Sequence, residues 1–241
     1  MPSGGVFASC ASGWCVRAVP STHDLDLRPT RTMKITAIQP QKLRADRVNV
    51  HVDGEFRLAL AAELALSEHL HVGDEVDEAR LAELEAKDHG WKARDAALSL
   101  LSYRARSATE LKRRLKRKGF EDETAEQTVA RMGELGMVDD AAFAESFVRD
   151  RVRLRPHGKR LLAQELRAKG VDEDTARAAI DGVLEREDAS EADLARAAAA
   201  RWRPRPGEEP DRARRRLQAF LARRGFGGEV VRDVVDGLLP G

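Results

Sequence analysis

The sequence of 241 residues has few aromatic residues, no long apolar run and almost no net charge. No stretch of about 18 apolar residues occurs, which argues against a membrane-spanning helix. The formal net charge is +1, so net charge by itself identifies no class of partner. Aromatic residues make up 5% of the chain, which leaves few rings for stacking on nucleobases.

Cysteine is also scarce, because Cys10 and Cys15 are the only two and both precede Met33. We predict that they are free thiols in a disordered tail, residues 1–32, with a disulfide or half a metal site as alternatives. This tail has little periodicity and lacks the basic and apolar regions of a secretory signal. We expect the folded part to begin at Met33. It contains no cysteine, which suits a reducing cytoplasm.

Sequence signatures of catalysis are missing as well. The chain has no Gly-rich phosphate loop, no His-Glu-x-x-His motif and no cysteine nucleophile in its folded part. Its serines lie in helical or capping contexts without a paired histidine. We therefore expect no enzyme, no catalytic residue, no metal site and no cofactor.

Residues 33–88 predict a small β-containing unit. Val48, Val50 and Val52 alternate on one face of a strand, and Asp53-Gly54 is a tight hairpin turn signal. Further strands are predicted at 34–38 and 56–60, a short helix at 61–67 and a second helix at 78–89. About 55 residues make a marginal core, so this unit is expected to pack against the helices after it.

A short, very basic helix is predicted at 107–118. Ser107 is its expected N-cap, with Glu110 at the capping-box spacing, and Gly119 is the expected left-handed residue after its end. Leu111 and Leu115 form a narrow apolar stripe. Residues 104–119 hold eight bases and one acid, whereas residues 53–95 hold twelve acids and five bases. Charge is therefore sorted by segment, and a segregated basic face can hold an anionic partner.

This pattern returns twice, with periods of 51 and 55 residues. The aligned columns are Gly119, Gly170 and Gly225; Leu115, Leu166 and Leu221; Leu111, Leu162 and Leu217; Phe120, Val171 and Phe226; Ala125, Ala176 and Val231; and Val129, Ile180 and Val235. Each copy reads as three helices, which gives three repeats at 92–137, 138–187 and 190–239. The expected helices are 92–104, 107–118 and 122–135; 139–153, 156–169 and 173–186; and 190–202, 210–224 and 228–239.

Features at the helix ends agree with this division. Asp139-Asp140 can cap a helix, and Pro156 suits the first turn of another. The Pro-rich segment 203–210 is expected to be a surface loop. Units stacked in tandem make an elongated, curved array.

The second helix of every copy is basic, so the array is expected to present one basic face. Such a face would match a long polyanion or a protein polymer with an acidic groove. The alternative is a charged helix surface that is simply solvated. Tyr103, Trp91 and Trp202 are the candidates for base stacking, but we expect each of them to be packed.

One set of motifs resembles a known family. Tyr103-Arg-x-Arg-Ser-x-x-Glu-Leu-x-x-x-Leu115, Lys118-Gly-Phe120, Leu135-Gly-Met-Val-Asp-Asp140 and Phe143-Ala resemble the RecX family of recombination regulatory proteins. The resemblance runs from about Met33 to Leu239 and is specific in the first two repeats. It is weaker in the third, where the Pro-rich segment intervenes.

The resemblance implies a cytoplasmic, non-enzymatic modulator of RecA. Family members bind in the groove of the RecA–single-stranded DNA filament, limit its extension and depress ATPase, strand-exchange and coprotease activities; some bind DNA directly. The positions that match the family's basic motif are Arg104, Arg106, Lys112, Arg113, Lys116 and Arg117. The repeat alignment extends the candidate partner- or DNA-binding set to Arg151, Arg155, Lys159, Arg160, Arg215, Arg216, Arg223 and Arg224.

Three hypotheses for function remain open. The first is a monomeric RecA-filament regulator that reaches single-stranded DNA directly or through RecA and needs no membrane. The second is a sequence-nonspecific nucleic-acid binder that acts through phosphate contacts without RecA. The third is a helical adaptor for another protein.

Overall fold

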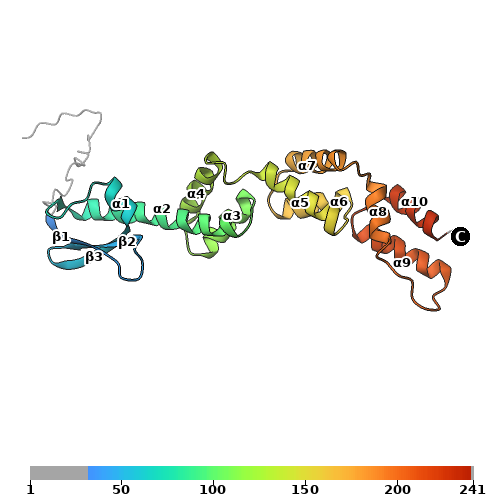
Figure 1. Ribbon diagram of the computed structural model, residues 1–241, viewed down its shortest axis with the longest axis horizontal. Helices are drawn as coiled ribbons and strands as arrows, with labels where there is room; N and C mark the ends of the chain where they lie inside the picture. The colour runs from blue at the N-terminus through green and yellow to red at the C-terminus, as the bar shows by residue number, and fades with distance from the viewer. Residues whose placement is uncertain (1–31, 240–241) are drawn as a thin grey trace, which may run out of the picture.

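The computed structural model describes residues 32–239, which form an elongated row of small units (Figure 1). A small sheet lies at one end, and three helical units come after it in chain order. This confirms the predicted mainly α fold with three tandem three-helix repeats after a β-containing unit. The tail predicted for residues 1–32, with both cysteines, lies outside the described residues except for Thr32.

The N-terminal unit contains a four-stranded antiparallel sheet of order β3-β2-β1-β4. Its strands are β1 (Met33–Pro40), β2 (Arg47–Val52), β3 (Glu55–Ala61) and β4 (Glu75–Val76), and α1 (Ala62–Ser67) follows β3. Asp53 and Gly54 both have positive φ, as the predicted hairpin turn requires. Strand β4 was not predicted, because two residues are too short to show an alternating pattern.

A single helix, α2 (Glu78–Tyr103), connects this unit to the first repeat. The two helices predicted at 78–89 and 92–104 were therefore wrong as separate elements. With 26 residues, α2 is about 39 Å long. Leu81 and Leu84 pack into the core of the sheet unit, and Ala97 packs into the core of the first repeat. Burial at both ends keeps the helix continuous through Gly90.

The other helices match the predicted repeat to within a few residues. They are α3 (Ala108–Arg117) and α4 (Asp122–Glu134); α5 (Asp140–Leu154), α6 (Lys159–Ala168) and α7 (Glu173–Arg186); and α8 (Glu191–Ala199), α9 (Pro210–Arg223) and α10 (Gly228–Leu238). All six leucines of the aligned columns are buried. Gly119, Gly170 and Gly225 have φ of +95°, +83° and +80°, so each ends its helix in the left-handed region.

The hydrophobic cores divide the array unevenly. The first repeat has its own cluster, which includes Leu111, Leu115 and Met132. The second and third repeats share one continuous cluster, to which Leu166 and Leu221 both belong. The third repeat also carries the predicted exposed loop around Gly207, which hangs below α9 in Figure 1. The two C-terminal repeats therefore form one packed body.

Candidate partner-binding face

Helix α3 begins at the predicted cap but without the full capping box. The Ser107 side chain accepts a hydrogen bond of 3.1 Å from the Glu110 backbone N–H. The Glu110 carboxylate accepts hydrogen bonds from Arg104 and Arg106 instead of returning to the backbone of Ser107. Burial raises the pKa of Glu110, but its hydrogen bonds with these two arginines outweigh burial, so the pKa lies below its ordinary value. Two of the candidate residues are thus occupied in holding the start of α3.

The other helices begin differently. Asp139 caps α5 as predicted, by accepting from two backbone N–H groups. Pro156 does not lie in the first turn of α6, because that helix begins after Gly158 and Pro156 is buried in the segment before it. Helix α9 carries Pro210 in its first turn.

The end of α6 lies directly against the start of α3. The Ser107 hydroxyl donates to the Lys169 carbonyl at 2.5 Å, and the Thr109 hydroxyl donates to the Gly170 carbonyl at 3.3 Å. Arg113 Nη2 adds a hydrogen bond of 3.2 Å to the carbonyl of Ala168. The carbonyl end of one basic helix therefore meets the N–H end of another, which also aligns their dipoles favourably.

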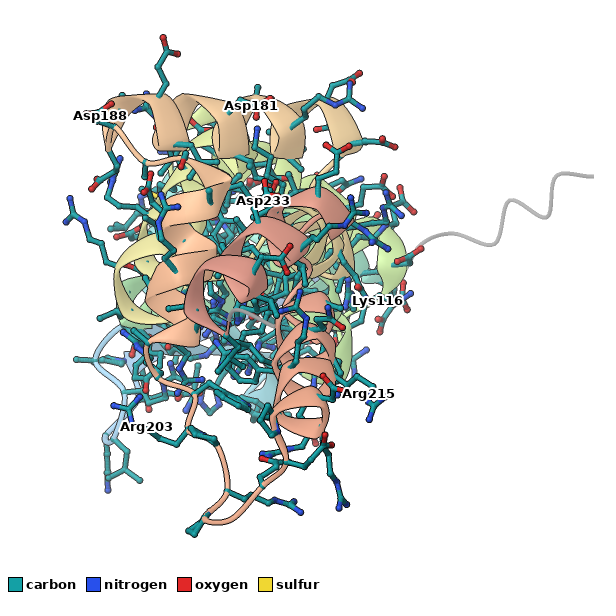
Figure 2. The ribbon with its side chains drawn as sticks, turned by 90° about the vertical axis from the view of Figure 1, so that its right-hand side faces the viewer. Lys116, Asp181, Asp188, Arg203, Arg215 and Asp233 are labelled. Carbon is teal, nitrogen blue, oxygen red and sulfur yellow. The ribbon has the colours of Figure 1, made fainter. Side chains whose placement is uncertain are left out.

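A second junction joins the end of α9 to the start of α6. The Gly158 N–H donates to the Arg224 carbonyl at 2.8 Å. A Cβ placed on Gly158 would lie 2.3 Å from the carbonyl oxygen of Gly225. Helices α3, α6 and α9 thus follow one another end to end, and we call this arrangement the basic row. Viewed along the molecule, Lys116 and Arg215 of the basic row lie on one side, whereas Asp181 and Asp188 lie along another edge (Figure 2).

Within the basic row and its flanks, the fourteen candidate residues differ in how far their charge is already matched. Apart from the buried Arg106, six are ion-paired with carboxylates: Arg104, Lys112, Lys116, Arg151, Lys159 and Arg216. Six are exposed and have no carboxylate within 4.0 Å among residues 32–239: Arg113, Arg117, Arg155, Arg160, Arg215 and Arg223. The unmatched candidates are therefore all arginines, which suit bidentate contacts to phosphate or carboxylate.

The remaining two candidates are structural. Arg106 is only 4% exposed and donates to the Leu100 carbonyl and to Glu110, so it does not belong to the exposed face. Arg224 lies over the Phe220 ring at 4.6 Å and donates to the Pro156 carbonyl. The family motif supplied Arg106 and the repeat alignment supplied Arg224, and neither kind of pattern shows which partners a side chain has in the fold.

Helix α4 neutralises part of α3. Lys112 lies 3.1 Å from Glu126 and 3.4 Å from Asp122, and Lys116 lies 2.9 Å from Asp122. Hydrogen bonds from Lys116 and Lys112 hold the pKa of Asp122 below its ordinary value. These two lysines bridge α3 to α4, which leaves Arg113 and Arg117 as the unmatched exposed arginines of the first repeat.

Aromatic side chains correct one expectation. Tyr103 is 83% exposed at the end of α2, although we expected it to be packed. Trp91 and Trp202 are half-buried against the cores, and Arg94 and Arg216 lie over their respective rings. Tyr103 is therefore available next to the basic row, and its place at the end of its helix was the only sequence signal for this.

In residues 32–239, the part of the chain that the structure describes, neither a cluster of metal ligands nor a helix able to cross a membrane is present. No three His, Cys, Asp or Glu side chains there come together in a group that could hold a metal ion. None of the helices there is both long and apolar enough to cross a membrane.

Comparisons with known proteins agree with the repeat architecture. Family models of RecX match four segments: the N-terminal domain at 33–77, and the first, second and third three-helix domains at 93–132, 139–180 and 189–235. The "Regulatory protein RecX" of Prosthecochloris aestuarii is 38% identical over 148 residues, which cover 61% of this chain and 94% of that protein. The chain belongs to the RecX family.

Other family members extend the likeness. The "Regulatory protein RecX" of Thermobifida fusca is 43% identical over 136 residues, covering 56% of this chain and 72% of that protein. A solved structure described as "Crystal structure of regulatory protein RecX" has a TM-score of 0.67 at 27% identity and covers 85% of this chain and 99% of its own. RecX from Lactobacillus salivarius, at 20% identity and a TM-score of 0.55, shows the same fold over 63% of this chain and 97% of its own. Membership of this family of regulatory proteins implies a regulatory role.

Proposed function

We propose that this protein is a non-enzymatic regulator that binds the RecA–single-stranded DNA filament through the basic row. Bound there, it limits filament extension and lowers RecA's ATPase, strand-exchange and coprotease activities. The observation that carries the proposal is the end-to-end junction of α3, α6 and α9, which joins three short basic helices into one row. Membership of the RecX family supports RecA as the partner in this proposal.

The dimensions of the basic row suit a polymer. Its three helices contain 10, 10 and 14 residues, so end to end they reach roughly 50 Å. A row with unmatched arginines in every repeat can contact several repeating units of a filament at once. Contacts to several units in one molecule raise the overall affinity without any single strong contact.

Because the second and third repeats share one hydrophobic core, they form a rigid unit and are not two flexibly linked domains. Leu166 and Leu221 belong to one hydrophobic cluster, and the α6–α9 junction has backbone atoms in contact. A rigid α6–α9 section of the basic row loses little conformational freedom on binding, which lowers the entropic cost of docking along a filament.

The test is RecA ATPase and filament length on single-stranded DNA with equimolar protein. The substitution set Arg117→Gln/Arg160→Gln/Arg215→Gln removes one unmatched charge per repeat. These arginines are better targets than Lys112, whose loss would also break its contacts with α4. We expect wild type to lower ATPase and shorten filaments, and the triple variant to do so much less.

A matched control removes the same charge elsewhere: Arg131→Gln/Arg186→Gln/Arg196→Gln. These three arginines are exposed and paired with carboxylates away from the basic row. The control variant should inhibit like wild type. If wild type leaves ATPase and filament length unchanged, the proposal fails.

The second candidate function is sequence-nonspecific nucleic-acid binding without RecA, and the six unmatched arginines favour it. It predicts tight, steeply salt-dependent binding to DNA alone. Weak binding to naked DNA with strong binding to the filament would reject it. A role as adaptor for another protein would be favoured if neutralising the basic row changed neither the inhibition of RecA nor the binding of DNA.

A further inference from the structure

A hollow of about 430 Å³ lies at the junction of α6 and α9. Three arginines surround it, namely Arg160 and Arg167 of α6 and Arg223 of α9. Small residues, Ala163, Ala222 and Gly225, also line it and leave room for a ligand to approach the helices. None of the described residues that line it is acidic, so we call it the arginine hollow.

The junction itself builds this arrangement. A Cβ on Gly225 would lie 2.4 Å from the backbone nitrogen of Leu161, and the φ of Gly225 is +80°. Only glycine allows α9 to end this close to the first turn of α6. As a result Arg223, two residues before Gly225, is held at the same hollow as Arg160.

A neighbouring hollow provides an internal comparison. It holds about 370 Å³ and lies on the other side of Arg160 and Arg167. There the cations are matched, because Lys159 lies 2.7 Å from Asp181 and Arg177 lies 3.0 Å from Glu173. The two hollows share residues of α6 but differ in charge, and only the arginine hollow combines several cations with no acidic lining residue.

The three guanidinium groups keep their charge available. Neither Arg160 nor Arg223 has a carboxylate within 4.0 Å among residues 32–239, and Arg167 has only Glu173 at 3.8 Å, with both side chains largely exposed. Exposed ion pairs of that kind contribute little free energy, so Arg167 also keeps its charge available for a ligand. Three like charges around one hollow repel one another, so an anion bound between them is stabilised.

We propose that the arginine hollow binds backbone phosphates of single-stranded nucleic acid. A carboxylate has two oxygens, which one arginine can satisfy, whereas successive phosphodiesters offer several anionic oxygens to three arginines. Besides the three arginines, the hollow is lined by small residues, Leu161 and Gln164, and contacts from arginine to backbone phosphates carry no sequence information. The inference rests on the proposed function, since it names what one section of the basic row contacts.

The test measures binding of a fluorescent oligothymidine by anisotropy over a salt series, without RecA. The variant is Arg160→Gln/Arg167→Gln/Arg223→Gln, and the control is again Arg131→Gln/Arg186→Gln/Arg196→Gln. Each lost phosphate contact should lower the slope of log affinity against log salt by about 0.7, or roughly 2 in all. When salt rises fourfold, wild type should then lose roughly fifteenfold more affinity than the variant.

A second variant, Ala222→Glu, places a carboxylate in the arginine hollow without removing any arginine. Ala222 is exposed on α9, so the substitution leaves the core intact, and circular dichroism should be unchanged. It should weaken oligothymidine binding, whereas Ala197→Glu, on an exposed position of α8, should not.

Three results would overturn the proposal. One is an equal loss in the control variant, which would indicate general electrostatics. Another is unchanged oligothymidine binding by the hollow variants, and the third is a loss confined to the RecA filament or to an acidic peptide, which would assign the hollow to a protein carboxylate. Because the oligothymidine measurement contains no RecA, wild type could fail to regulate RecA and the arginine hollow would still be tested.

Discussion

The junction between α6 and α3 depends on glycine at residue 170, and replacing it should show how tightly the repeats are joined. In Gly170→Ala the new Cβ would lie 2.3 Å from the Cβ of Thr109, and the φ of +83° is unfavourable for alanine. The left-handed conformation alone costs about 1–2 kcal/mol. The overpacked contact adds about 1–3 kcal/mol, because Thr109 is held at the start of α3 and cannot retreat freely.

Gly119→Ala is the matched control. Gly119 occupies the corresponding place after α3, with a φ of +95° and open space around its Cβ position. Gly119→Ala should therefore lose only the stability that the left-handed conformation costs, about 1–2 kcal/mol. Urea unfolding followed by circular dichroism measures both variants, and small-angle X-ray scattering reports whether the row bends at the α6–α3 junction.

The Thr109→Gly substitution separates the two contributions. Thr109→Ala would keep the offending Cβ, whereas Thr109→Gly removes it, so the double variant Gly170→Ala/Thr109→Gly should lose less stability than the two single variants summed. Equal losses at Gly170 and Gly119, with additive behaviour at Thr109, would refute a tight junction.

Two further predictions concern the N-terminal unit and α2. Asp88→Asn should destabilise the protein by about 3 kcal/mol at neutral pH, because Asp88 is 1% exposed and pairs with buried Arg47 at 2.8 Å. Burial raises the pKa of Asp88, but Arg47, Lys92 and the Ala61 N–H outweigh it and lower the pKa below the ordinary 3.8. The unfolded chain therefore takes up this proton first, so the difference in unfolding free energy between wild type and Asp88→Asn should shrink as pH falls below about 4; a constant difference would contradict the assignment. Gly90→Ala should stabilise the protein by up to about 1 kcal/mol, since Gly90 lies inside α2 with open space at its Cβ position; a loss of thermal stability would indicate that α2 needs to bend there.

The repeat could be predicted because it depends on local sequence patterns. Leu111 and Leu115 recur with their counterparts at one helical spacing, and the glycine that ends each second helix has a requirement for positive φ that holds in any surroundings. Ser107 as a cap could be predicted in the same way, since its partner lies three residues away.

The candidate site was only partly accessible to such reasoning. The match to the family's basic motif placed Arg106 beside Arg117, yet the first is buried against Leu100 and Glu110 and the second is exposed. Lys112 looked free until α4 brought Asp122 and Glu126 against it. The carboxylates that match Lys112 lie 10 and 14 residues further along the chain, and the repeat pattern does not show that α4 brings them back against α3.

The sequence by itself determined the three repeats, their apolar stripes, the C-terminal ends of the second helices and the family. Only the tertiary structure decided that α2 runs unbroken through Gly90, that α3, α6 and α9 join end to end, and which arginines remain unmatched. The physical reason is range: helix ends and stripes depend on neighbours within a turn or two, whereas junctions depend on contacts such as Ser107 with Lys169, 62 residues apart. The basic row is a property of those distant contacts.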